Sequence, residues 1–557
     1  MTINKKFQNI LPIIVFLAGM LPILYNIGTM GLLEPTEGLI ASISRYMVKN
    51  NNLSIPVFNG VKHFEYAPGV YWITSLGIKI FGNNEFAARF FLSVAAGLTA
   101  LCIFFIAKLF FGQQCAVISS LLLCTSALFQ ISFRTISPAA YCTAFESLLC
   151  MVFFYYLNKP SLLLRHIFWL ILSLGFMFSG VPVLFPIIAI SLVAIFTGQS
   201  EQIKKLYLFG PGMICFAVFG LGWYIIQIIL NDGLLGYYLY KLPYSSIFHN
   251  YNGTPFYFFI FLPLVAVFPW TSIWFQEIKN KIKDFKDDPV ITYLVSWAFL
   301  PFFLRLLMTS RDCSQFMSSL PPLILLTAPA FQMLYFKKDD KSEDCIKIVQ
   351  QRRKHNLILV IAVAIVGMIS SIYGGINYET TNTISKCFTF AGIFWLFSSL
   401  IMLAFMIKKL NKSVIVPAAM LIPSLLLFSV PAIQGNEPLS KNSYLSCKYF
   451  ILKEALKDKQ DVIICEKPLY SSYFYTGIDF KIVLDDKDRK QLDFVTKEGN
   501  SLILTYESTF KQNLLPETLL IMPSSAKDKI EKIINTELEF KYEQAGWNNF
   551  LYKGTKK

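Results

Sequence analysis

The chain has 557 residues, of which 55% are hydrophobic, 16% are aromatic and only 15% are charged. Soluble domains carry about 25% charged residues and their cores stop growing at about 250–300 residues, so this composition excludes a single soluble domain and predicts a membrane protein. The net charge of +15 does not predict a nucleic-acid partner, because the Lys and Arg residues lie in short segments between apolar runs. In that position, basic residues orient a membrane protein.

Apolar runs long enough to cross a hydrocarbon core of about 30 Å recur along residues 1–432. The first run follows Lys5-Lys6 and is not followed by a small-residue cleavage site, so we interpret it as a span and not as a signal peptide. Gly180-Val181-Pro182 separates two short runs as either a tight turn or a kink. We predict about 13 spans, at residues 8–27, 91–111, 115–133, 138–157, 165–179, 182–197, 207–230, 256–275, 290–307, 316–336, 357–375, 386–407 and 413–432.

The connectors between these runs alternate in charge. If the N-terminus is cytoplasmic, every strongly basic connector falls inside, as the positive-inside rule requires, and an odd number of spans places the C-terminus outside. The outer connectors 135–138, 231–254 and 374–385 contain few basic residues. The basic connectors hold Lys108, Lys159 with Arg165, Lys204-Lys205, residues 279–286, residues 337–354, and Lys408-Lys409.

Two regions break the pattern of short connectors. The first outer loop, residues 28–90, contains helical stretches at 37–50 and about 71–81 with mixed polar and aromatic faces, which predicts helices lying along the outer surface. Residues 433–557 alternate β-like runs with helical ones and are long enough to hold their own core. The β-like runs are 462–464, 501–504 and 519–522, and the helical ones are 444–457 and 526–535.

The predicted fold is therefore an all-α polytopic membrane bundle with outer-face amphipathic helices and a small soluble α/β C-terminal domain. The predicted domains are residues 1–432, which form the transmembrane domain, and residues 433–557, which form the soluble one.

The first outer loop also concentrates the ionisable residues. Carboxylates at the mouth of a membrane bundle are unfavourable unless they are paired or hydrated, so this set predicts a polar cavity. The alternative is that these residues cap helices and contact lipid headgroups, with Thr36 or Glu37 capping the helix that follows. The residues concerned are Glu34, Glu37, Glu65, Arg45 and Arg89.

The order of motifs in this loop resembles the GT-C superfamily of membrane glycosyltransferases, in particular the branch of the lipid A aminoarabinose transferases and the relatives of protein mannosyltransferases. Residues 254–259 with 268–270, and residues 310–316 with 321–322, resemble later stretches of that branch. The matching residues of the first loop are Glu37, Ser44-Arg45-Tyr46-Met47, Phe64-Glu65, Pro68, Tyr71-Trp72 and Glu85-Phe86-Ala87-Ala88-Arg89.

The resemblance implies that a polyprenyl-phosphate sugar donor enters from the bilayer of a bacterial inner membrane. Its sugar passes to an outer-face acceptor, a lipid A-type glycolipid or a protein, in a hexosyl or pentosyl transfer. Glu37 or Glu34 would act as base or electrostatic organiser, and Glu65 would hold the loop or the acceptor. The expected phosphate ligands are arginines, which bind phosphate in a bidentate manner: Arg45, Arg89 and Arg311.

The sequence departs from the family's pattern at Thr36, where the family has its catalytic Asp, and at Tyr66, where it has a phosphate-contacting Lys. Tyr66 can donate one hydrogen bond but brings no charge. A family His falls at Asn252, with His249 three residues earlier. Glu65 and His249 are therefore weak candidates for a divalent metal site, since four His in the whole chain offer little material for one.

Two cations outside the first loop are candidates for the lipid phosphate, and each has an alternative role. Arg311 lies in a short outer connector and is otherwise a headgroup anchor. Lys241 follows Tyr237, Tyr238 and Tyr240, which otherwise form an aromatic belt.

Two further functions stay open. Under these alternatives the chain is either a lipid-binding relative that has lost catalysis, which Thr36 and Tyr66 suggest, or a transporter of lipid or sugar. Transporters place ionisable residues or broken helices near the bilayer midplane, whereas the charges here collect at the outer mouth.

Overall fold

The structure is a computed structural model of the chain. It describes residues 5–241, 288–306, 313–335, 462–465, 469–484, 503–505, 518–523, 526–534, 538–544 and 547–552, with scattered residues in 262–274 and 357–400. The chain forms two compact units. The first, the helical unit, comprises Met1–Tyr25, Leu92–Asn231 and Tyr238–Val430. The second, the loop–sheet unit, comprises Asn26–Phe91, Asp232–Tyr237 and Pro431–Lys557.

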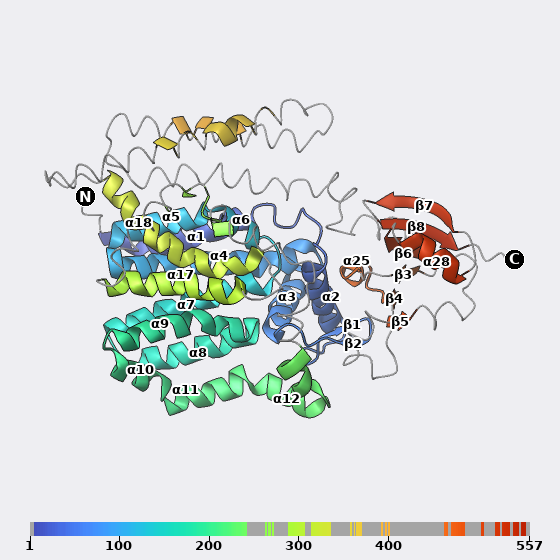
Figure 1. The fold of residues 1–557 in the computed structure, drawn as a ribbon, viewed down its shortest axis with the longest axis horizontal. Coiled ribbons are helices and arrows are strands. Elements are labelled where there is room, and N and C mark those ends of the chain that lie inside the picture. Colours follow the sequence, from blue (N-terminus) through green and yellow to red (C-terminus); the bar gives the residue numbers. More distant parts are fainter. Residues whose placement is uncertain are drawn as a thin grey trace. The chain divides into compact units, whose positions relative to one another are not determined.

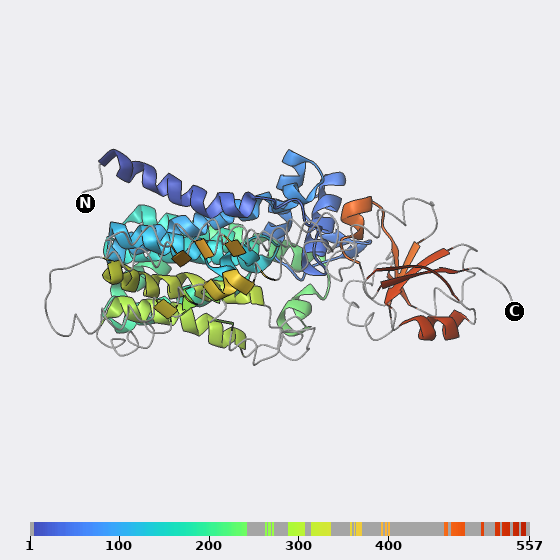
Figure 2. The same ribbon diagram turned by 90° about the horizontal axis from the view of Figure 1, so that it is seen from above.

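The helical unit is a bundle of apolar helices that run side by side (Figures 1 and 2). Local signals set where several of them begin. Pro138 occupies the first turn of α7, where its missing N–H is not needed, and Ser137 Oγ accepts the N–H of Ala140. The helices are α1 (Lys5–Leu24), α4 (Glu85–Phe111), α5 (Gln113–Cys124), α6 (Ala127–Ser132), α7 (Pro138–Asn158), α8 (Leu162–Ser179), α9 (Leu184–Phe196), α17 (Pro289–Leu306) and α18 (Leu320–Tyr335).

Of the helices within the described residues, α4, α7 and α8 are long and apolar enough to cross a membrane. A bent pair, Ser200–Tyr207 with Gly210–Gly220, would make a fourth span if it is counted as one. Shorter apolar helices occupy several other predicted spans, including those at α1, α5, α9, α17 and α18. The predicted spans 386–407 and 413–432 lie largely or wholly outside the described residues, so the count of about 13 spans stays a prediction.

The first outer loop forms two helices and a hairpin. The helices α2 (Thr36–Lys49) and α3 (Pro68–Phe81) pack together, and Ser44 Oγ bonds the carbonyl of Tyr71 while Ser75 Oγ bonds that of Ser44. They coincide within a few residues with the predicted helical stretches. Strands β1 (Val57–Phe58) and β2 (Val61–Lys62) are joined by Asn59-Gly60, both with positive φ, a favoured two-residue hairpin turn.

The C-terminal part of the loop–sheet unit is a six-stranded sheet of order β5-β4-β3-β6-β8-β7 (Figure 1). β3 (Val462–Cys465), β4 (Lys481–Leu484), β5 (Ile503–Thr505) and β6 (Thr518–Pro523) are parallel. β3, β5 and β6 lie on the runs predicted as β-like, whereas β4 was not predicted. β7 (Glu539–Gln544) and β8 (Trp547–Tyr552) add an antiparallel edge. Helix α28 (Lys527–Ile534) contributes Ile530 to a core with Ile463, Val483, Leu520 and Met522.

Between β3 and β4 the chain makes a short helix, α25 (Ser472–Thr476). This helix packs against α2 of the first outer loop. The C-terminal region predicted as a separate domain thus lies in one compact unit with the first outer loop. The helical stretch predicted at 444–457 lies outside the described residues.

Candidate functional site

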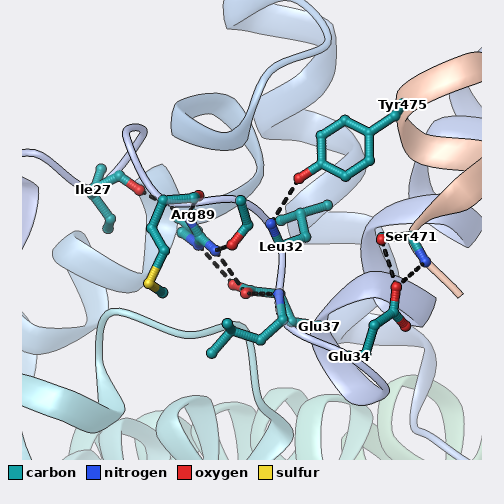
Figure 3. Close-up of polar contacts among 10 residues, drawn as sticks. Ile27, Leu32, Glu34, Glu37, Arg89, Ser471 and Tyr475 are labelled. Atoms are coloured by element: carbon teal, nitrogen blue, oxygen red, sulfur yellow. Dashed lines mark hydrogen bonds and ion pairs between the residues drawn. The ribbon is translucent and has the colours of Figure 1, made fainter. Parts of the chain in front are cut away.

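Glu37 and Arg89 form a buried ion pair at the start of the first outer loop (Figure 3). Arg89 Nε lies 2.7 Å from Glu37 Oε1, and Nη2 lies 2.6 Å from Oε2. Their side chains are 1% and 2% exposed. Because Glu37 sits in the first turn of α2 and Arg89 in the first turns of α4, the pair ties two helix starts together.

The same guanidinium also holds the loop that precedes α2. Arg89 donates to the carbonyls of Ile27, Met30 and Gly31 at 2.6–3.0 Å, and Glu37 Oε2 accepts the N–H of Leu33 at 2.8 Å. We call residues 27–37 the 27–37 loop. All of these N–H groups of Arg89 therefore bond to partners inside the protein, which is typical of a residue that fixes loop geometry.

Glu34 lies in the 27–37 loop but faces a different part of the chain (Figure 3). Its Oε1 accepts the N–H of Ser471 at 2.8 Å and the hydroxyl of Ser471 at 2.5 Å, and its Oε2 accepts the N–H of Tyr470 at 3.0 Å. Three donors thus share one carboxylate. This geometry binds the first outer loop to residues just before α25.

Arg45 lies on α2, three turns after Glu34, and also contacts α25. Its Nη1 donates to the carbonyls of Tyr473 at 3.0 Å and Phe474 at 2.6 Å, and its guanidinium stacks 5.8 Å from the Tyr473 ring centroid. Burial lowers the pKa of Arg45, and the neighbouring Tyr473 opposes that shift. Like Glu34, Arg45 is engaged with the C-terminal part of the unit.

Glu65 is the most open of the three carboxylates expected at the site. Its side chain is 49% exposed, and its Oε2 lies 3.4 Å from Nε2 of His63, whose Nδ1 lies 3.0 Å from the hydroxyl of Tyr71. Burial acts to raise the pKa of Glu65, but the hydrogen bond and charge of His63 outweigh it and lower that pKa. Glu65 thus stays ionised and accessible.

Two tyrosines complete the surroundings of Glu65. The ring of Tyr66 lies 5.8 Å from the His63 ring. Burial first, and then the charge of Glu65, raise the pKa of Tyr237. Tyr237 opens the π-helical turn Tyr237–Lys241, which supplies a residue near Glu65 from a second outer connector.

The remaining expected residues are placed as follows. Thr36 is the first residue of α2. The structure describes the backbone of Lys241 but not its side chain, and His249 and Arg311 lie outside the described residues. Among the described residues no group of three or more His, Cys, Asp or Glu side chains could hold a metal ion.

Several site residues were not singled out from the sequence. Ser42, His63, Ser471 and Tyr475 all make the contacts that join the expected residues, and Leu32 N–H donates to the Tyr475 hydroxyl at 2.7 Å. One signal was available, because Glu34, Gly38, Ser42, Arg45 and Lys49 recur every three or four residues, as one face of a helix does.

A further carboxylate lies inside the helical unit. Glu146, in the middle of α7, is 1% exposed, accepts from the Cys142 thiol at 3.3 Å and bonds the hydroxyl of Ser318. A buried ionisable residue in a candidate span is a site of interest in its own right. The Ser318 bond ties α7 to the turn Cys313–Ser319, which precedes α18.

Chemically, the arrangement has a closed part and an open part. Glu37, Arg89, Glu34 and Arg45 organise backbone, whereas Glu65 with His63 can meet a solute. A carboxylate of this kind can position a hydroxyl or amine group by accepting its hydrogen bond.

Comparison with known proteins bears on the fold and the kinship of the chain. Residues 65–223 match the family model of dolichyl-phosphate-mannose-protein mannosyltransferase. An undecaprenyl phosphate-alpha-4-amino-4-deoxy-L-arabinose arabinosyl transferase of Aeromonas hydrophila is 27% identical over 305 residues, 53% of this chain and 55% of the relative. A second such transferase, from Proteus mirabilis, is 24% identical over 338 residues, 58% of this chain and 60% of the relative.

The chain thus spans little more than half the length of the curated relatives that it matches. The crystal structure of ArnT from Cupriavidus metallidurans bound to undecaprenyl phosphate superposes with a TM-score of 0.78, covering 98% of each chain at 15% identity. The chain therefore has the ArnT-like, mostly helical fold. The resemblance to the GT-C superfamily of membrane glycosyltransferases, in its aminoarabinose- and mannosyltransferase-related branch, is confirmed.

Proposed function

We propose that the chain is a membrane glycosyltransferase that moves one sugar from a polyprenyl-phosphate donor to an acceptor on the outer face of a bacterial inner membrane. The observation that carries the proposal is the fold likeness over 98% of the chain to a protein that binds undecaprenyl phosphate. The matched relatives are named arabinosyl transferases, which supports a pentosyl transfer.

The proposed topology has about 13 spans, a cytoplasmic N-terminus and a periplasmic C-terminal α/β region. The apolar helices α1, α4, α5, α7, α8, α9, α17 and α18 support the part of this topology that the structure describes. In this arrangement the first outer loop lies at the outer interface. A lipid-borne donor reaches that level without leaving the bilayer.

In the proposed reaction an acceptor oxygen attacks the anomeric carbon of the donor sugar. The bond from that carbon to the phosphate oxygen breaks, and polyprenyl phosphate leaves with the bonding electrons. A hydroxyl acceptor must also lose a proton to a base. A phosphate acceptor is already anionic and needs mainly positioning and charge balance.

The geometry of the first outer loop favours the anionic acceptor. Glu37 is ion-paired with Arg89, and Glu34 accepts three hydrogen bonds, so both carboxylates are engaged. We assign Glu37 the role of electrostatic organiser and Glu65, half exposed beside Tyr66, the role of acceptor-side ligand. In this assignment a phosphate-bearing lipid A-type glycolipid donates hydrogen bonds to Glu65 from its sugar hydroxyls, and Arg311 and Lys241 stay the proposed ligands of the donor phosphate.

The test compares glycolipids and membrane proteins, by mass spectrometry, from cells with and without this chain. We expect one species to carry an added pentosamine, hexosamine or hexose mass only when the chain is present. With Glu65→Gln the amount of the sugar-modified species should fall about tenfold or more, because the acceptor loses the group that positions it. Glu201→Gln, a change at a side chain that is 73% exposed on the helix Ser200–Tyr207, is the matched control and should leave the product unchanged.

Two outcomes would overturn the proposal. If no lipid or protein changes mass, the chain is not a transferase in that cell. If purified chain in vesicles moves the donor lipid across the bilayer without transferring sugar, it is a transporter. The alternative of a lipid-binding relative without catalysis is favoured by Thr36 and Tyr66, and the first outcome supports it.

A further inference from the structure

A segment that is distant in the sequence lies along one face of α2. We call this face, together with Glu34, the track. Gly38, Ser42, Arg45 and Lys49 follow one another along this face at steps of three or four residues, and Glu34 lies just before the helix. Residues 469–480, which we call the α25 segment, contact each of them. Ser42 Oγ both donates to the carbonyl of Tyr470 at 2.6 Å and accepts the N–H of Phe474 at 2.9 Å.

The charges along the track match the polarity of a helical segment. The carboxylate of Glu34 meets N–H groups just before α25, and the cations Arg45 and Lys49 meet carbonyls at its end, where Lys49 Nζ lies 3.2 Å from the carbonyl of Gly477. Helix starts expose N–H groups and helix ends expose carbonyls. A helix of five residues is marginal alone, so α25 depends on these partners.

Two glycines let the track and the segment approach closely. A Cβ on Gly38 would lie 2.7 Å from the nitrogen and 2.9 Å from the Cβ of Ser471. Gly477 has a φ of +71°, and a Cβ there would lie 2.6 Å from Nη2 of Arg45. No larger residue fits at Gly38 without moving the segment.

The α25 segment also reaches the loop of the buried ion pair. Leu32 N–H donates to the Tyr475 hydroxyl at 2.7 Å (Figure 3). Leu32 stands between Gly31, whose carbonyl accepts from Arg89, and Leu33, whose N–H donates to Glu37. Tyr475 therefore holds the one backbone position that lies between two contacts of the Glu37–Arg89 pair.

We propose that the α25 segment is part of the functional site and that Glu34, Ser471 and Tyr475 are its positioning residues. Glu34 fastens the segment to the loop just before α2, and Tyr475 fixes the 27–37 loop that carries Glu37. On this reading Glu34 is not a base. The activity part of the test rests on the proposed glycosyl transfer, whereas the hydrogen-exchange part does not.

The first test is a double-mutant cycle of Glu34→Gln and Ser471→Ala in the full chain in lipid nanodiscs. Both changes weaken the bond between the Ser471 hydroxyl and Glu34 Oε1. Ser471→Ala deletes the donor, whereas Glu34→Gln removes the acceptor's charge and turns one acceptor oxygen into an amide donor that faces a backbone N–H. Each should therefore raise hydrogen exchange of residues 469–477 about tenfold. The exchange of the double variant should rise by less than the product of the two single effects, because partners that share a contact are not additive. Sugar transfer should fall to a similar degree in all three.

A different pattern would overturn the role of Glu34. If Glu34→Gln abolishes transfer while its exchange and the activity of Ser471→Ala stay normal, Glu34 acts in chemistry. If the two changes add fully in exchange, they do not share a contact.

The second test uses Tyr475→Phe, which removes only the oxygen that accepts Leu32 N–H. Exchange of the Leu32 amide should rise about tenfold, since a buried N–H loses its partner. The turnover number kcat should fall about fivefold while the KM of the donor changes by less than about twofold, because the pair acts on the transition state more than on donor binding.

Matched controls keep this test decisive. Tyr473→Phe makes the same change two residues earlier and should leave the exchange of the Leu32 amide unchanged. Gly38→Ala should release residues 469–477, whereas Gly236→Ala, with nothing within 4 Å of its added Cβ, should not. Unchanged Leu32 exchange in Tyr475→Phe overturns the proposal, even if the chain proves to transfer no sugar.

Discussion

The first outer loop contains two acid–base pairs of opposite character. Glu37 and Arg89 are 2% and 1% exposed and share two hydrogen bonds, while Glu65 and His63 are 49% and 18% exposed and lie 3.4 Å apart. The buried pair is surrounded by backbone carbonyls and N–H groups that it satisfies. The open pair has a carboxylate in reach of a solute. Two carboxylates of the same chemical type thus differ in role because they differ in burial. The buried one holds the backbone, and the exposed one is a candidate for contact with a substrate.

The difference has an energetic basis. Two charges lose much of their hydration when they are buried, so removing one partner leaves an uncompensated charge, at a large cost. An exposed pair stays hydrated and contributes little to stability. The two pairs should therefore respond oppositely to substitution, one in folding and the other in activity.

The largest effect is expected from Arg89→Met, which strands the Glu37 carboxylate in the interior. We expect a loss of about 3–5 kcal/mol of stability, because the buried charge then has neither its cation nor water. Thermal unfolding of the detergent-solubilised chain measures it. The double variant Glu37→Leu with Arg89→Met should recover part of the loss, since it leaves no buried charge.

An exposed pair supplies the control. Lys204 and Glu201, three residues apart and 65% and 73% exposed, form an ion pair at 3.2 Å. Lys204→Met should leave the unfolding temperature unchanged. If Arg89→Met melts like the wild type, the buried pair is not architectural and the contrast between the two pairs fails.

A smaller effect is expected from His63→Gln, which acts on the open pair. His63 lowers the pKa of Glu65 against the raising effect of burial, so the variant should protonate Glu65 at a higher pH. A lowered pKa means that the carboxylate's contribution is present above its unfolded value of about 4.3 and is lost as the pH falls through the folded value. The acid limb of the pH–rate profile should therefore move to higher pH.

His166→Gln is the control for this change, since His166 packs on Phe209 with ring centroids 4.7 Å apart and is not among the causes of the pKa shift of Glu65. Its acid limb should match that of the wild type. If the acid limb of the pH–rate profile stays at the same pH in His63→Gln, the ionisation of Glu65 does not govern the reaction.

Much of this architecture follows from local signals in the sequence. Hydropathy and the Ser137-Pro138 start predict α7, and the spacing of polar and aromatic residues predicts α2 and α3. The apolar runs at β3 and β6 predict strands, which the structure pairs in parallel. These features depend on neighbours a few residues apart, which is the range that hydrophobic periodicity and capping report.

The partners of the site residues were beyond that range. Glu34 bonds Ser471, which is 437 residues away along the chain, and Arg45 bonds Phe474. Composition predicted that these residues gather at a polar site. It could not show which of them form hydrogen bonds to backbone groups and which stay accessible. Nor did it reveal Glu146, because a single Glu inside an apolar helix does not disturb the hydropathy of the span.

The smallest expected effect concerns Asp479, a carboxylate between the two extremes, in the α25 segment. Burial raises its pKa, and Lys49 opposes that rise. Its Oδ1 is buried with no hydrogen-bond partner among the described residues. A raised pKa means that the stabilising contribution is complete below the unfolded value of about 3.9 and is lost as the pH rises through the folded value.

At neutral pH the charged form of Asp479 is therefore unfavourable in the docked segment. Asp479→Asn keeps the shape of the side chain and removes its charge, so hydrogen exchange of residues 472–480 should slow by about twofold at pH 7. At a pH where the wild-type carboxyl is protonated, the two proteins should exchange at the same rate. Asp528→Asn, at an exposed position of α28, should change neither. Faster exchange in Asp479→Asn would mean that the carboxylate holds the segment through its charge. Asp479 would then belong with Glu37 among the carboxylates that organise backbone.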